Sequence, residues 1–223
     1  MDDVTKFPRP MVTVDIVIFS MHDHELKVLL IKRDIQPYKG GWALPGGFVH
    51  IDEDLEVAAK RELLEETGVK DVYLEQLYTF GDPKRDSRGR VITIAYFALI
   101  KSEGQRLDPK TDVSEANWFS AYQPPKLAFD HSKILEYALK RLQWKLEYTT
   151  VAFQFLQDKF TLTELQKIYE TILHKKFDKR NFRKKIFALD IVEDTGDILE
   201  GMAHRPAKLY KCNKKIGELV EIL

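Results

Sequence analysis

The sequence has a single cysteine, Cys212, so the chain cannot form an internal disulfide. Its first ten residues show no basic stretch followed by an apolar one, which a secretory signal would need. No apolar run approaches the ~20 residues required to span a bilayer. We therefore expect a cytoplasmic protein with no membrane partner.

The chain also lacks an excess of charge of either sign, because 35 Lys and Arg residues balance 35 Asp and Glu residues. A general affinity for nucleic acid or for a membrane surface is therefore not indicated, and any charge signal must be local. What is present is 44% hydrophobic and 31% charged residues in a chain of 223. This composition is typical of a globular protein with one large domain or two small ones.

The first 146 residues have the pattern of a mixed α/β domain. Segments rich in β-branched residues predict strands, and apolar residues at helical spacing predict helices. The fold class expected is α+β, a mixed sheet with helices on its faces. The predicted strands are 11–20, 26–32, 42–44, 72–80, 91–100 and 118–119, and the predicted helices are 54–67, ended by Gly68, and 132–146.

Beyond residue 146 the pattern changes to short helices followed by a hairpin. A first helix is predicted at 149–156. A second should begin after the capping-box pattern at Thr161, and a third should span 179–188 with Asp178 as its N-cap. Two strands, 190–194 and 207–211, would flank a loop containing Gly196 and Gly201. This order predicts a small winged helix-turn-helix, with domains at 1–146 and 147–223.

Three carboxylates, Glu62, Glu65 and Glu66, stand at i, i+3 and i+4 of the helix predicted at 54–67, so they share one face. Such close carboxylates raise one another's pKa unless a cation neutralises them, and their hard oxygens suit Mg²⁺ or Mn²⁺. Arg61 can pair with a neighbouring glutamate. The run alone would more often be an ordinary solvated helix face. The spacing of three other residues relative to this run favours the metal site instead, namely Gly47, Glu53 and Gly68.

From Gly47 to Val69 the sequence resembles the Nudix signature at every defined position. The resemblance implies that Glu62, Glu65 and Glu66 are metal ligands, helped by the Gly47 carbonyl, and that with Arg61 they would form the catalytic set of a hydrolase of nucleoside diphosphate compounds. A general base could come from outside this segment. The polar loop at 81–90 carries the cations Lys84, Arg85, Arg88 and Arg90. This loop could bind phosphate or ribose, and the equal alternative is that it is only a solvated basic turn.

The segment 175–185 carries seven basic residues against one acid, Asp178. In the helix predicted there, Phe182, Ile186 and Phe187 are spaced to face a core. This leaves a polar face for the major groove, where Arg reads guanine and Asn reads adenine, while the hairpin could contact phosphates. The alternative is a charge run that keeps a small helix soluble. The candidate DNA contacts are Lys179, Arg180, Asn181, Arg183 and Lys184, with Arg205 and Lys208 on the hairpin.

Taken together, the chain resembles the Nudix-related transcriptional regulators of the NrtR family. The resemblance lies in VTVDIVIF, GWALPGGFV, the Nudix box, the segment LYTFGDPKRDSRGRVITIAYFAL, LAFDH, KFDKRNFRKKI and RPAKLY. It implies a homodimeric repressor of a metabolic operon for NAD synthesis or pentose use, which binds palindromic operator DNA. The effector would be ADP-ribose or, in a Bacteroidetes branch, a sugar such as L-arabinose.

Two hypotheses follow. The first is a ligand-responsive regulator whose Nudix domain senses its effector without being an enzyme. The second is a metal-dependent hydrolase of ADP-ribose or a related compound. Many regulators of this family have a degraded Nudix box, whereas the box here is whole, so catalysis remains open.

Overall fold

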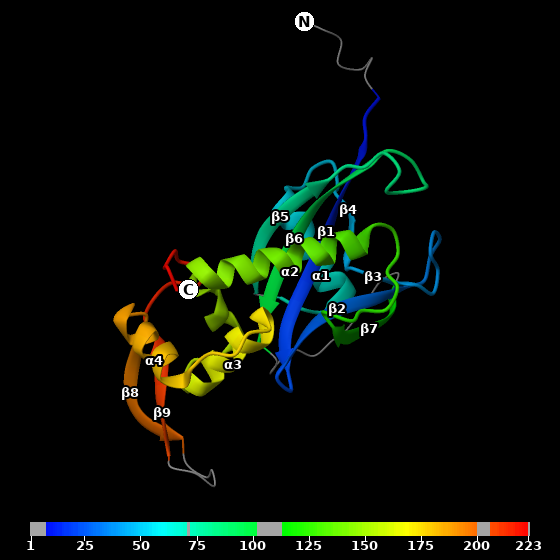
Figure 1. Cartoon of the computed structure of the whole chain (residues 1–223). Coiled ribbons are helices and arrows are strands. Elements are labelled where there is room, and N and C mark those ends of the chain that lie inside the picture. Colours follow the sequence, from blue (N-terminus) through cyan, green and yellow to red (C-terminus); the bar gives the residue numbers. More distant parts are fainter. Residues whose placement is uncertain (1–7, 71, 102–112, 200–205, 223) are drawn as a thin grey trace, which may run out of the picture. The chain divides into compact units, whose positions relative to one another are not determined.

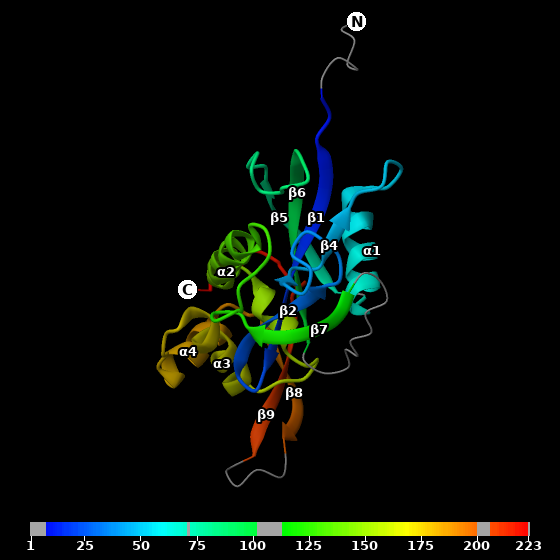
Figure 2. The same cartoon turned by 90° about the vertical axis from the view of Figure 1, so that its right-hand side faces the viewer.

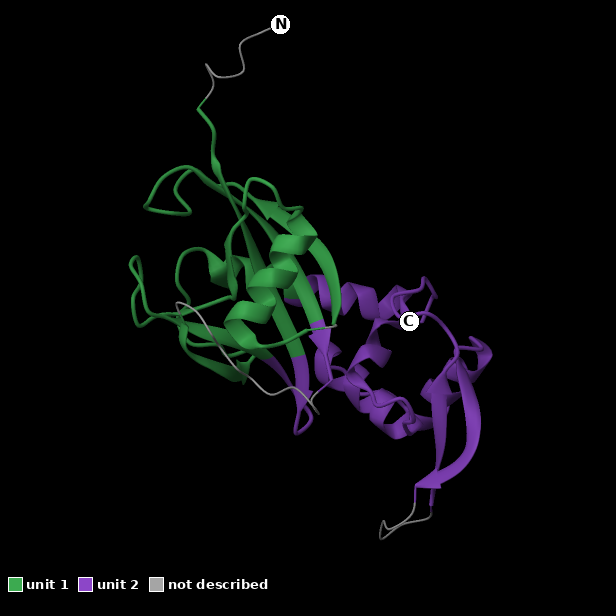
Figure 3. Ribbon diagram, turned by 180° about the vertical axis from the view of Figure 1, so that it is seen from behind, with its two compact units in different colours: residues 1–19, 28–98, 105–138 green, residues 20–27, 99–104, 139–223 purple. Residues whose placement is uncertain are grey.

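A computed structural model describes residues 8–70, 72–101, 113–199 and 206–222. The chain divides into two compact units, coloured separately in Figure 3. Unit 1 comprises residues 1–19, 28–98 and 105–138, and unit 2 comprises residues 20–27, 99–104 and 139–223. The domain boundary predicted at residue 146 falls, like this division, inside the helix α2 (His131–Tyr148), and it remains a prediction.

The first unit is built on a seven-stranded sheet of order β3-β2-β1-β6-β5, in which β4 also pairs with β1 and β7 with β2 (Figure 1). The strand bounds are β1 Met11–His22, β2 Glu25–Arg33, β3 Trp42–Ala43, β4 Gly46–Phe48, β5 Tyr73–Phe80, β6 Val91–Ile100 and β7 Val113–Ser120. The predicted mixed sheet with helices on its faces is confirmed, although β4 was expected as a turn and β7 is longer than predicted.

Strand β1 shows why the sheet is covered on both sides. Its residues from Ile16 to Phe19 are fully buried although they point alternately to the two faces. Such a continuous apolar run is typical of a strand between two helical layers. In Figure 2, α1 (Leu55–Thr67) lies on one face of the strands and the first part of α2 on the other.

Helix α1 has the limits that its sequence predicts. The Asp54 side chain accepts a hydrogen bond from the Glu56 N–H at the N-terminus, and Gly68 ends the helix in the left-handed region at φ 77°. Because both ends are fixed, the register of the carboxylates along α1 is fixed too. No helix in the described part of the chain combines the length and apolarity needed to cross a membrane.

The second unit contains the 3₁₀ helix η2 (Thr150–Phe155), α3 (Leu162–Leu173), α4 (Lys179–Ala188) and a hairpin of β8 (Val192–Leu199) and β9 (Ala207–Cys212), called the wing below. The capping box joins Thr161 and Glu164 as predicted. The Asp178 side chain caps α4 by accepting from the Asn181 N–H. The predicted helix order is confirmed, except that the first helix is a 3₁₀ helix.

Two predictions in this unit were wrong. Phe187 was expected in the core but is 49% exposed, resting against the Tyr210 ring at a centroid distance of 5.7 Å. Ile186, the preceding residue, is buried in the core, so the side chain of Phe187 points in a different direction. Gly196 was expected in a loop but lies within β8, where the pairing register shifts between Asp194 and Ile198. Gly201 lies outside the described residues.

Candidate functional site

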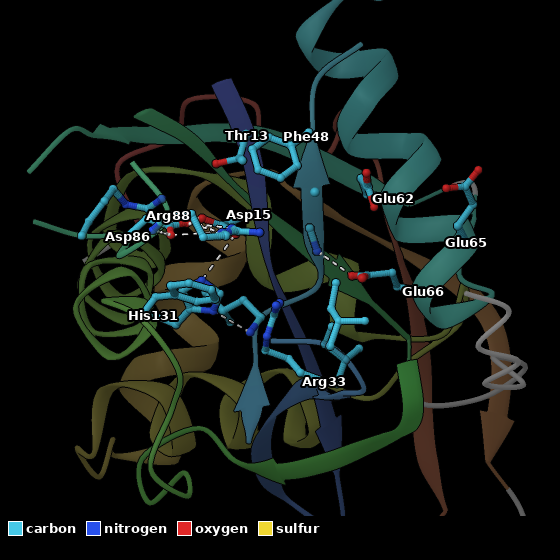
Figure 4. Close-up of a pocket in the computed structure, with 17 residues that line it drawn as sticks. Thr13, Asp15, Arg33, Phe48, Glu62, Glu65, Glu66, Asp86, Arg88 and His131 are labelled. Atoms are coloured by element: carbon cyan, nitrogen blue, oxygen red, sulfur yellow. Dashed lines mark hydrogen bonds and ion pairs between the residues drawn. The ribbon is translucent and has the colours of Figure 1, made fainter. Parts of the chain in front are cut away.

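A pocket of about 310 Å³ opens in unit 1 between the first half of β1 and the side of α1 that carries the glutamates (Figure 4). Because β4 pairs with β1 through Thr13–Asp15, it holds the start of the signature segment beside this opening. One wall is acidic and the other carries guanidinium and aromatic groups. The residues used below that line it are Thr13, Asp15, Arg33, Gly46, Gly47, Phe48, Glu62, Glu65, Glu66, Arg85, Asp86, Arg88, Phe129 and His131.

The acidic wall consists of the three glutamates predicted to share one face of α1. Glu62 and Glu66 are each 8% exposed, whereas the side chain of Glu65 is 42% exposed. The Gly46 N–H donates to Glu66 Oε2 at 2.7 Å. All three glutamates line the pocket from the same helix, with Glu65 nearest to solvent; their joint role as metal ligands stays a prediction.

Arg61 connects this wall to the preceding turn. Its Nη1 lies 2.7 Å from Glu62 Oε1 and 3.2 Å from Glu65 Oε2. Its Nε and Nη2 bind the two oxygens of Glu53 at 3.0 and 2.6 Å. The hydrogen bonds from Arg61 lower the pKa of Glu53 to about 2. Arg61 thus acts as the predicted positioning group, since it fixes the side chains of its acidic neighbours.

Gly47 permits the close approach of α1 to β4. A Cβ at position 47 would lie 2.2 Å from Glu62 Oε1. At Gly46 a Cβ would lie 2.1 Å from the Val14 carbonyl oxygen of the paired strand. Gly46 is therefore required by its backbone neighbours and its φ of 152°, whereas a side chain at Gly47 would push aside the end of Glu62; both glycines line the same pocket as the carboxylates.

Burial is the main cause of the raised pKa values of two glutamates in this wall. It raises the pKa of Glu66 to about 8, and the charges of Glu62 and Asp15 add smaller increases. Burial also raises the pKa of Glu62, with the charge of Glu65 contributing less. The expected mutual repulsion thus raises both pKa values, but burial has the larger effect, because these two side chains lie deeper than an exposed helix face.

The donor set fits a hard divalent cation, since it offers carboxylate oxygens and a backbone carbonyl. In the described part of the chain, however, no three acidic, histidine or cysteine side chains are gathered closely enough to hold an ion as they stand. Arg61 holds Glu62 and Glu65, and the Gly46 amide holds Glu66. A cation would therefore have to draw these carboxylates away from their present partners.

The raised pKa of Glu66 predicts a pH effect on stability. A carboxyl with a pKa near 8 in the folded state and 4.5 otherwise stabilises the fold only while it is protonated. We expect the melting temperature of the metal-free protein, measured in EDTA, to fall from pH 6 to pH 9 more steeply than that of Glu66→Gln. Equal slopes for the two proteins would contradict the assignment.

A buried ionic cluster forms the floor of the pocket. Arg85 Nη2 lies 3.1 Å from Asp15 Oδ2 and 2.8 Å from Asp130 Oδ1, and the Arg85 side chain is 3% exposed. His131 Nδ1 accepts the Leu44 N–H at 2.9 Å, and burial lowers the pKa of this histidine. The alternative of a solvated turn is therefore wrong for Arg85, whose hydrogen bonds are directed at carboxylates rather than outward.

The other loop cations differ in position. Arg88 lines the pocket, binds Asp86 at 2.7 Å and lies over the rings of Phe48 and Phe129, with Cζ 5.0 and 5.5 Å from their centroids. Lys84 is exposed, and Arg90 donates to the Gly81 carbonyl at 2.6 Å. Neither Lys84 nor Arg90 lines this pocket.

Arg33 is a pocket residue that the sequence analysis did not identify. Its Cζ lies 5.0 Å from the centroid of the Phe129 ring, and its Nε donates to the Pro37 carbonyl. Its Nη2 is buried and has no hydrogen-bond acceptor within the described residues. The hydroxyl of Thr13 in the same pocket is likewise buried and unpaired there. The pocket wall therefore offers a donor to an anionic or hydroxylated ligand.

A second candidate site is the surface of α4 in unit 2. Lys179, Arg180, Asn181 and Lys184 are exposed as predicted, whereas Arg183 is half-buried with Nη2 3.3 Å from Thr163 Oγ1. On the wing, Lys208 binds Asp194 at 2.6 Å. Arg205 lies outside the described residues, so its expected phosphate contact stays a prediction.

Two family models match this chain. The NUDIX domain model matches residues 9–138, and the model of the NrtR DNA-binding winged helix domain matches residues 152–212. Together they span both structural units and both candidate sites. Members of the Nudix family generally use divalent metal ions, in keeping with the donor set at the acidic wall.

Individual relatives share this two-part organisation. The "ADPR responsive transcriptional repressor NtrR" of Acinetobacter baylyi is 43% identical over 210 residues, which are 92% of this chain and 83% of that protein. The crystal structure of Shewanella oneidensis NrtR with a 27mer DNA is 40% identical, has a TM-score of 0.80, and matches 91% of this chain and 93% of that chain. The NUDIX domain of the same protein with ADP ribose is 42% identical, with a TM-score of 0.57 over 63% of this chain and 93% of that one. The chain therefore belongs to the NrtR family of Nudix-related transcriptional regulators.

Proposed function

We propose that this protein is a transcriptional repressor that binds operator DNA through α4 and releases it when ADP-ribose binds the Nudix pocket. The observation that carries the proposal is that one chain contains both sites. One is a pocket with carboxylates suited to a metal and an arginine, Arg33, whose Nη2 has no acceptor among the described residues. The other is a helix with exposed cations that have no carboxylate partner there. The relatives named above, one ADP-ribose responsive and one bound to DNA, support it. A palindromic operator would match the proposed homodimer.

The chemistry of the pocket favours a diphosphate over a neutral sugar. A divalent cation, Mg²⁺ or Mn²⁺, held by Glu62, Glu65, Glu66 and the Gly47 carbonyl would neutralise and polarise phosphoryl oxygens. The free Nη2 of Arg33 can donate to a further phosphoryl oxygen, and the rings of Phe48 and Phe129 offer apolar surface to a base or ribose. An uncharged pentose can hydrogen-bond to these groups through its hydroxyls, but it brings no negative charge to match a bound cation or the Arg33 guanidinium.

The test is a fluorescence-anisotropy titration of the full chain against the promoter of its own neighbouring genes. We expect ADP-ribose with Mg²⁺ to weaken DNA binding about tenfold or more, a typical size for coupled sites, and EDTA to suppress the effect. Operator DNA should weaken ADP-ribose binding by the same factor. No binding at low salt would contradict the DNA role. A response to L-arabinose but not to ADP-ribose would contradict the effector.

A second function is favoured by the intact carboxylate wall. Glu62, Glu65 and Glu66 line one pocket, and Arg61 binds two of them, which is the residue set expected of a hydrolase of ADP-ribose. The same incubations, sampled for AMP release, decide between a pure sensor and a sensor that also cleaves its effector. Release that persists in the variant carrying both Glu65→Gln and Glu66→Gln would exclude these residues as its cause.

A further inference from the structure

The cations of the DNA-binding unit fall into two classes. On α4, Lys179, Arg180, Lys184 and Lys185, called the α4 cations below, are exposed, and none has a carboxylate partner among the described residues. Three lysines on or beside the wing are instead paired with carboxylates. Lys208 binds Asp194 at 2.6 Å, Lys211 binds Glu193 at 3.1 Å and Lys159 binds Asp197 at 2.7 Å.

The paired carboxylates all come from one strand. Glu193, Asp194 and Asp197 lie on β8, whereas β9 supplies only Lys208 and Lys211. In its described residues the wing thus carries more acid than base. A hairpin that only contacted phosphate would be expected to carry the opposite excess, because binding to DNA is driven by cations that displace counterions.

Asp194 is held in place as well as paired. Its Oδ1 accepts the Gly196 N–H at 2.9 Å, in the part of β8 where the pairing register shifts, and its Oδ2 accepts from Lys208. The hydrogen bond from Lys208 is the main reason that the pKa of Asp194 lies below its ordinary value. The carboxylate is therefore ionised at neutral pH while it lies beside Lys208.

We propose that the β8 carboxylates limit the affinity for DNA by competing with phosphate for the wing lysines. A phosphate that contacts Lys208 must share this ammonium with Asp194 or displace the carboxylate, and in either case the phosphate lies near a like charge. The specific contacts of α4 consequently dominate binding, and the sequence-independent part of the affinity stays low. A weaker non-specific term favours discrimination between operator and other DNA. This inference rests on the DNA-binding role proposed above.

The test is the variant Asp194→Asn in the full chain, which keeps an acceptor for the Gly196 N–H. We expect the affinity for a non-cognate duplex to rise about three- to tenfold and the plot of log K against log salt to steepen by about 1, the effect of one added phosphate contact. Glu56→Gln is the matched control. The Glu56 side chain is 59% exposed and paired with Lys60, so its loss changes net charge equally but in unit 1.

A second substitution separates competition from a general charge effect. Lys208→Gln should change DNA affinity little in the native background and should abolish the gain in the Asp194→Asn background. An unchanged affinity and salt slope in Asp194→Asn, or equal gains in Glu56→Gln, would overturn the inference while leaving DNA binding by the native protein intact. Failure of the native protein to bind operator DNA would instead overturn the proposed function.

Discussion

Replacing Arg85 with methionine is expected to lower the free energy of unfolding by about 3–5 kcal/mol, because a buried ion pair that loses one partner leaves unpaired charge in the interior. Here two carboxylates would be stranded, since Asp15 and Asp130 are 9% and 10% exposed in their side chains and both face Arg85. Urea denaturation followed by tryptophan fluorescence measures the loss. Binding of ADP-ribose should fall in parallel, because the cluster forms the floor of the pocket.

The control for this substitution is Lys60→Met, which removes a cation from an exposed pair. The side chains of Lys60 and Glu56 are 61% and 59% exposed, so the change should cost less than ~1 kcal/mol. The triple variant Arg85→Met, Asp15→Asn and Asp130→Asn should recover part of the stability, since it removes the stranded charges. A loss below about 1 kcal/mol in Arg85→Met would show that the cluster is not a buried ionic network.

Loss of the α4 cations is expected to abolish specific DNA binding. The triple variant Lys179→Ala, Arg180→Ala and Lys184→Ala should weaken operator binding by roughly a hundredfold or more and lower the salt slope by about 2 to 3. Alanine favours helix, and the buried positions Phe182 and Ile186 are untouched, so α4 should remain folded. Anisotropy titrations at several salt concentrations give both quantities.

A matched control removes the same charge from unit 1. Lys39, Lys126 and Lys133 are exposed there, and their replacement by alanine should leave the operator affinity within about twofold of the native value. If both triple variants lost affinity equally, net charge would explain the effect. If the α4 variant bound as well as the native protein, the contact surface would lie elsewhere.

The parts of the structure that could be predicted are those with local causes. Asp54 and Gly68 limit α1, Thr161 begins α3 and Asp178 begins α4, because capping depends on residues within a few positions. The shared face of Glu62, Glu65 and Glu66 follows from helical periodicity alone. Their depth of burial does not, since it depends on strands that pack against α1.

The parts that could not be predicted depend on distant partners. Arg85 meets Asp130 across 45 positions and Asp15 across 70, and no short-range pattern marks such pairs. The family resemblance includes Asp130 and His131 through the segment LAFDH, but it does not indicate that they lie at the pocket or contact Arg85. The unpaired donor of Arg33 emerges only when the surrounding side chains are placed, because an arginine that ends a strand is ordinarily solvated.

The lack of room for a side chain at Gly47 has an evolutionary consequence. Every other amino acid places an atom about where the Glu62 carboxylate lies, so any mutation of this single residue displaces one of the glutamates of the acidic wall. The Asp15, Arg85 and Asp130 cluster and the aromatic side of the pocket use no atom of residue 47. A lineage could thus lose metal chemistry in one step and retain a ligand-binding cavity, which is a short route from an enzyme to a receptor.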